Sequence, residues 1–104
     1  MTKDKTKVIK KVTSAKSQWT FLSNHAHVLI CLSRDPDLRL KDVAVLVGIT
    51  ERAVQTIVKD LVQAKILGIS KDGRRNSYVI NADQKLRHNL EANHSISELL
   101  KLGR

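Results

Sequence analysis

One glycine separates two apolar patterns in the middle of the chain, and both predict helices. The second pattern follows Thr50, a good helix N-cap. Its apolar residues recur at helical spacing: Val54, Ile57, Val58 and Leu61. The first pattern, Lys41 to Val47, alternates valines and fits a strand as well as a helix. Gly48 decides for a helix, because glycine readily adopts the left-handed conformation that ends one. The sequence therefore predicts a short helix, a turn and a longer amphipathic helix.

The segment before this pair predicts a first helix that is apolar on every side. Leu22 to Arg34 has Ser23 placed at its N-cap, and Asp35-Pro36 ends it. Its centre, Val28 to Leu32, is apolar in five consecutive positions. Such a helix has to be covered from more than one side. Leu38 to Leu40 alternates and predicts one short edge strand.

The C-terminal half predicts a hairpin followed by a short helix. Leu67–Lys71 and Ser77–Ile80 are expected to be strands joined at Asp72-Gly73, a preferred hairpin turn pair. After an irregular stretch, Ser95 and Glu98 form the capping box of a helix at about residues 95–102. The predicted fold class is mainly α with a small β-hairpin, an α+β arrangement.

These elements resemble the winged helix-turn-helix domain of bacterial and archaeal transcription regulators, particularly MarR- and ArsR-like ones. The resemblance covers residues 22–81 and includes the apolar positions of the longer helix and Ile66-Leu67 before the hairpin. Its main segment is Lys41-Asp42-Val43-Ala44-Val45-Leu46-Val47-Gly48-Ile49-Thr50. It implies a recognition helix at about 50–64 and a wing at about 67–80. Two positions depart from the family pattern: Arg39 replaces a capping Ser or Thr, and Lys65 replaces a glycine before the wing.

Positive charge is concentrated at the N-terminus. The 104 residues carry a net charge of +9, and residues 1–18 hold six lysines against one acid. A charge of this size favours polyanionic partners, nucleic acid before an anionic membrane. No apolar run approaches the roughly 20 residues of a membrane span, so we expect no membrane partner and a cytoplasmic location.

Three regions follow from these patterns. Residues 1–18 form a basic arm, residues 19–83 the winged helix-turn-helix domain, and residues 84–104 a C-terminal extension with a short helix. Polar, charged termini are commonly solvated tails. Three apolar residues of the arm, however, fall on one helical face with Trp19, which follows it: Val8, Val12 and Ala15. The arm is therefore either a solvated tail or a segment that becomes ordered on phosphate or on a partner.

Candidate DNA-binding residues lie opposite the apolar face of the longer helix and around the hairpin turn. Arg52, Gln55 and Thr56 are expected to read bases, since Arg pairs with guanine and Gln with adenine in the major groove. Basic and polar residues expected on phosphate or in the minor groove are Lys59, Lys71, Arg74, Arg75 and Asn76. Amphipathic helices and hairpin tips are often polar without binding anything, so these assignments depend on the resemblance and on the overall charge.

The sequence gives little support for catalysis or metal binding. His25 and His27 are two residues apart and so point to different sides of a helix. His88 and His94 lie in or beside irregular segments, and the single cysteine, Cys31, is expected in the core. There is no nucleophile elbow and no glycine-rich phosphate loop. We expect no enzyme activity, no cofactor and no metal.

The function predicted is that of a sequence-specific, double-stranded DNA-binding transcriptional regulator. The alternative is a winged-helix interaction module for a protein partner or RNA. We also expect a symmetric homodimer, because two recognition helices match a palindrome. The residues expected at its interface are Trp19, Phe21, Ile96, Leu99 and Leu100. Docking of the C-terminal helix on the first helix of its own chain would instead leave a monomer.

Overall fold

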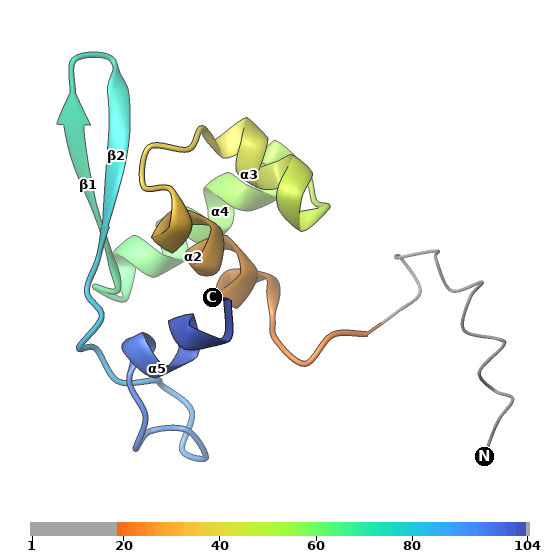
Figure 1. Ribbon diagram of the computed structural model, residues 1–104, viewed down its shortest axis with the longest axis vertical. Coiled ribbons are helices and arrows are strands. Elements are labelled where there is room, and N and C mark those ends of the chain that lie inside the picture. Colours follow the sequence, from red (N-terminus) through yellow and green to blue (C-terminus); the bar gives the residue numbers. More distant parts are fainter. Residues whose placement is uncertain (1–18, 104) are drawn as a thin grey trace, which may run out of the picture.

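The computed structural model describes residues 19–103, which form four α-helices and one two-stranded antiparallel hairpin (Figure 1). The elements are α2 (Asn24–Arg34), α3 (Leu40–Val47), α4 (Glu51–Gln63), β1 (Leu67–Asp72), β2 (Arg75–Ile80), α5 (Ile96–Leu100) and the 3-10 turn η2 (Lys101–Gly103). The predicted α+β class is confirmed. The expected basic arm, residues 1–18, lies outside the described residues. No helix within residues 19–103 is long and apolar enough to cross a membrane.

Helix α2 begins and ends close to the predicted positions. The Ser23 hydroxyl accepts a hydrogen bond from the Ala26 N–H at 3.3 Å, as expected of an N-cap. The helix therefore starts at Asn24, two residues later than Leu22. It ends at Arg34, and the N–H of Asp35 donates to the Cys31 carbonyl at 3.1 Å.

The strand expected at Leu38–Leu40 is wrong. Leu40 is the first residue of α3, and its N-cap is Arg39. The backbone that bonds to the outer edge of β2 is that of Pro36, whose carbonyl accepts the Tyr78 N–H at 3.1 Å. Leu38 and Leu40 are both half-buried against the core. Their alternation therefore reflects two inward side chains at a helix start, which a three-residue pattern does not distinguish from a strand.

The turn between α3 and α4 is confirmed as predicted. Gly48 has a φ of +88° and ends α3, with its N–H donating to the Ala44 carbonyl at 2.8 Å. The Thr50 hydroxyl accepts the Ala53 N–H at 3.0 Å and caps α4. The four apolar residues predicted to face inward are buried: Val54, Ile57, Val58 and Leu61.

The hairpin turn is shifted by one residue from its expected position. The two loop residues are Gly73 and Arg74, because Asp72 pairs with Arg75. Gly73 has a φ of +67°, and glycine at the first loop position is the preference of a type II′ turn. This register pairs apolar residues with each other on one face of the hairpin. The pairs are Leu67 with Ile80 and Ile69 with Tyr78.

Lys65 takes the left-handed conformation where the resembling family has glycine. Its φ is +64°. The hydrogen bonds around it fix the exit from α4: the Ile66 N–H donates to the Leu61 carbonyl at 3.0 Å, and the Asn81 N–H to the Ile66 carbonyl at 2.8 Å. A lysine in this conformation costs about 1–2 kcal/mol. Despite this cost, β1 begins two residues later, at Leu67.

The C-terminal segment covers the second side of α2 within the same chain. Ile96 and Leu100 are buried in one cluster with Leu29, and the Arg34 guanidinium donates to the Gly103 carbonyl, with 2.8 Å from its Nε. In Figure 1, α5 lies against α2, at the end of the molecule away from the hairpin tip. Ile96 and Leu100, which were expected at a dimer interface, are thus buried within this chain, and the dimer itself stays a prediction. Residues of the same chain pack against α2 on both of these sides.

Candidate nucleic-acid interface

The outer face of α4 presents four polar residues in one row. Arg52, Gln55, Thr56 and Lys59 are all exposed. They share a face because residues three and four apart lie together on a helix, and the apolar residues between them are turned into the core. We call these four residues the α4 stripe. The structure thus brings together the residues expected to read bases and Lys59.

A groove of about 520 Å³ runs between the α4 stripe and the hairpin. Its far wall is formed by Ile69, Asn76 and Tyr78. Lys71 is the cross-strand partner of Asn76, so both side chains stand on the hairpin face that turns toward α4. Two of the four hairpin residues singled out from the sequence therefore share the groove side with the α4 stripe.

Arg75 belongs to the other face of the hairpin and has a structural contact that the sequence did not indicate. Its Nη2 donates to the Asp37 carbonyl at 2.8 Å. Together with the bond from Tyr78 to Pro36, this contact ties β2 to the loop between α2 and α3. Arg74 is exposed at the tip of the hairpin. Both arginines are exposed, and Arg75 is the one whose side chain is also bonded to the α2–α3 loop.

Arg39 is a basic residue that sequence reasoning treated only as a poor cap. In the described part of the chain, the Arg39 side chain makes no hydrogen bond that would cap α3. It lines a hollow together with Glu51, Arg74 and Arg75, beside the hairpin tip. A cation at a helix N-terminus opposes the helix dipole, so its position there is unfavourable for α3. That conflict is the sequence signal by which Arg39 could have been identified as a candidate interface residue.

Thr56 has one of its hydrogen-bonding groups occupied within α4. Its hydroxyl donates to the Arg52 carbonyl at 3.2 Å. The oxygen lone pairs and the methyl group stay available on the exposed side. In the major groove, a threonine in this state accepts a hydrogen bond from a base or contacts a thymine methyl.

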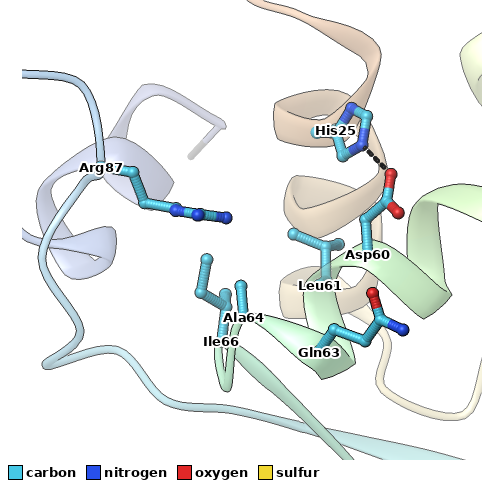
Figure 2. A pocket seen from close by; sticks show the side chains of 7 residues that line it. All are labelled: His25, Asp60, Leu61, Gln63, Ala64, Ile66 and Arg87. Carbon is cyan, nitrogen blue, oxygen red and sulfur yellow. Dashed lines mark hydrogen bonds and ion pairs between the residues drawn. The ribbon is translucent and has the colours of Figure 1, made fainter.

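A second hollow, of about 540 Å³, lies beside the C-terminal half of α4 (Figure 2). His25 of α2 and Asp60 of α4 face each other there, with Nε2 and Oδ2 2.8 Å apart. Figure 2 shows Arg87 reaching toward this pair from the segment between β2 and α5. The contact between His25 and Asp60 joins two helices that are far apart in the sequence. It therefore helps to fix the position of α4.

The described residues offer few arrangements for metal or thiol chemistry. Within residues 19–103, no three His, Cys, Asp or Glu side chains are grouped closely enough to hold a metal ion. His94 and Glu98 are four residues apart and form a pair on the surface, with 2.8 Å between Nδ1 and Oε1. Cys31 is half-buried at the edge of the core. Burial raises the pKa of its thiol, while the nearby Arg34 acts in the opposite direction.

Comparison of the chain with protein-family models, with curated proteins and with solved structures finds no match in any of the three. Function is therefore inferred from the geometry of these residues.

Proposed function

We propose that this chain is a sequence-specific, double-stranded DNA-binding transcriptional regulator. In this proposal residues 22–81 form a winged helix-turn-helix domain similar to those of MarR- and ArsR-like regulators. Helix α4 enters the major groove, and the hairpin acts as a wing on the backbone or in the minor groove. The observation that carries the proposal is the groove between the α4 stripe and the hairpin face of Lys71 and Asn76.

The dimensions of α4 suit the major groove of DNA. Its 13 residues extend about 20 Å, and a helix about 10–12 Å across fits a groove about 12 Å wide. Arg52 and Gln55 lie one turn apart on the exposed side. In the proposal they contact neighbouring base edges, guanine and adenine respectively. Lys59, one turn further along, contacts phosphate.

Charged residues around the hairpin supply contacts that do not depend on sequence. Lys71 and Arg74 are exposed and reach phosphate or the minor groove in this proposal. Arg39 adds a further positive charge beside the hairpin tip. Arg75 acts indirectly, since its bond to the Asp37 carbonyl holds the hairpin in place.

The decisive experiment is selection of bound duplexes from a random pool by the full-length chain. We expect a defined consensus, and affinity for it that falls steeply as salt rises. Arg52→Ala should relax the preference at one base position and cost about 1–3 kcal/mol there, whereas Lys59→Ala should weaken all duplexes alike. An unchanged consensus with Arg52→Ala would contradict the role of α4.

The apolar part of the groove favours the second candidate, a module that binds a protein partner or RNA. Ile69 of β1 lines the hairpin side of this groove and is 50% exposed. Apolar surface of this kind suits a protein side chain or an unstacked RNA base. If the selection yields no consensus and duplex DNA binds no better than other polyanions at moderate salt, this second candidate replaces the first.

A further inference from the structure

Two of the three aromatic residues of the chain project from the surface just before α2. The rings of Trp19 and Phe21 form a T-shaped pair with centroids 4.8 Å apart. Their exposed fractions are 76% and 91%. In a T-shaped pair the edge of one ring covers one face of the other, so each ring keeps at least one face open to solvent. We call Trp19 and Phe21 the aromatic pair.

The aromatic pair follows the most basic segment of the chain. Residues 1–18 contain six lysines and one acid, and the last of these lysines, Lys16, stands three residues before Trp19. Proteins bind single-stranded nucleic acid with this combination, because the positive charges attract the phosphates and the aromatic rings stack on the unpaired bases. The charge of the sequence and the exposure of the rings therefore point to the same kind of partner.

We propose that the aromatic pair binds single-stranded DNA, with unpaired bases stacked on the open faces of Trp19 and Phe21. Every base has a flat aromatic face, so this binding does not depend on sequence. It goes beyond the proposed function, in which α4 reads duplex DNA. Stacking alone does not distinguish DNA from RNA. The choice of DNA rests on the proposed function, which brings the chain to DNA.

The composition of the basic segment favours a nucleic-acid strand over an anionic membrane surface. A segment that lies on a membrane needs a broad apolar face rich in leucine or aromatic residues. Residues 1–18 contain neither leucine nor an aromatic residue. Trp19 and Phe21 would therefore enter the lipid almost alone. On a single strand, the lysines and the rings each have a partner of matching chemistry.

The aromatic pair lies away from the α4 stripe. Phe21, Leu61 and the half-buried Leu99 line one hollow of about 390 Å³. Leu61 follows Arg52 by nine residues, about two and a half turns, so these two side chains are on opposite sides of α4. A strand on the aromatic pair therefore leaves the stripe open to a duplex. Glu91 also lines the hollow, so we expect the phosphates to pair with the lysines that precede the aromatic pair and not to enter the hollow.

Fluorescence of Trp19, the single tryptophan, tests the proposal on the full-length chain without duplex DNA. The probe is a strand of about 12 thymidines, within the range of single-strand site sizes. Its control is a strand of the same length in which every base is missing, so that only the phosphates remain to bind. We expect the thymidine strand to quench the Trp19 emission, because a stacked base quenches indole fluorescence. The strand without bases should bind about 100-fold more weakly, about tenfold for each of two stacked bases, and leave the emission unchanged.

Paired substitutions locate the site. Trp19→Leu with Phe21→Leu keeps apolar side chains but removes the aromatic faces. This variant should bind the thymidine strand about 100-fold more weakly, measured by the fluorescence anisotropy of a labelled strand, and should bind the strand without bases as the parent chain does. Val45→Ala with Leu46→Ala is the matched control, because both residues are exposed apolar residues of α3. Circular dichroism confirms that both variants fold.

Three results overturn the proposal: equal binding of the two strands, an aromatic variant that binds the thymidine strand like the parent chain, or a uridine strand that binds more tightly than the thymidine strand. A shift of the Trp19 emission on anionic phospholipid vesicles but not on the thymidine strand would assign the aromatic pair to a membrane instead. Base-dependent binding of the thymidine strand without any duplex consensus would leave the aromatic pair as a single-strand site and refute the proposed function.

Discussion

Replacing Ile96 by alanine tests whether α5 is held by its own chain. Ile96 is 2% exposed and belongs to the same buried cluster as Leu29 of α2. The change removes three buried carbon atoms at about 0.8 kcal/mol each, together about 2.4 kcal/mol. The cavity left behind adds to this loss, so we expect the free energy of unfolding to fall by about 3 kcal/mol. That is a large share of the stability of a domain of this size.

Urea denaturation followed by circular dichroism measures this loss at two protein concentrations, about 5 and about 100 μM. The control is Leu102→Ala in the same C-terminal segment, where the side chain is 68% exposed and the change should cost less than about 0.5 kcal/mol. The reasoning would be refuted by an Ile96 variant as stable as the parent chain. A loss that changes with protein concentration would refute it too, because α5 would then be held by a second copy.

Substitutions at five further residues probe single contacts. Lys65→Gly should raise the free energy of unfolding by about 1 kcal/mol by relieving the left-handed backbone, and Lys65→Ala should not; urea denaturation measures both. Arg74→Ala should reduce the slope of log K against log salt by about 0.9 in DNA titrations. Arg75→Ala should lower the free energy of unfolding by about 1 kcal/mol, because its bond to the α2–α3 loop is lost. The pKa of Glu98 lies below its usual range, first because its carboxylate accepts the backbone N–H of the N-cap serine and then through its bond to the neighbouring histidine. The Glu98 carboxylate therefore contributes to stability above pH 4.5, and this contribution is lost as the pH falls below that value. Glu98→Gln should remove this pH dependence. A Glu98 carboxyl whose titration, followed by NMR, shows the ordinary pKa would contradict the prediction. Arg39→Ser should stabilise the fold by about 1 kcal/mol as a better cap and still weaken DNA binding, which calorimetry and DNA titration separate.

The ends of the helices were predictable because the signals that set them are short-ranged. Ser23, Thr50 and Ser95 each bind a backbone N–H three residues ahead. Gly48 ends α3 through its own positive φ. In each case the residue type and its partner lie within one turn of chain, so a single sequence contains the whole interaction.

The hairpin register was not predictable from its turn residues. Asp72-Gly73 and Gly73-Arg74 are both acceptable two-residue loops, with glycine second in one and first in the other. Cross-strand packing selects the second loop, since it sets Ile69 against Tyr78 instead of against Asn76. The choice therefore depends on residues three to five positions from the turn and on the core beneath them.

Contacts between distant segments also had no local signal. The bond from Arg75 to the Asp37 carbonyl and the pair of His25 with Asp60 join residues more than 30 positions apart. The α4 stripe was predictable, because it is the face opposite the apolar one. What stands across the groove from it depends on tertiary structure, and for the same reason the bond of Arg75 to the α2–α3 loop was not predicted.

Two basic residues stand at positions where another residue type would be more stable locally. Arg39 stands at a helix N-cap, where a serine would be more stable, and Lys65 adopts a conformation in which glycine costs less. Violations of local preference concentrate at functional or strained sites. Both residues are exposed, and they flank opposite ends of the pair of helices that presents the α4 stripe. A surface that binds a polyanion gains from each charge, so the local cost at both positions is what the proposed DNA-binding function would lead us to expect.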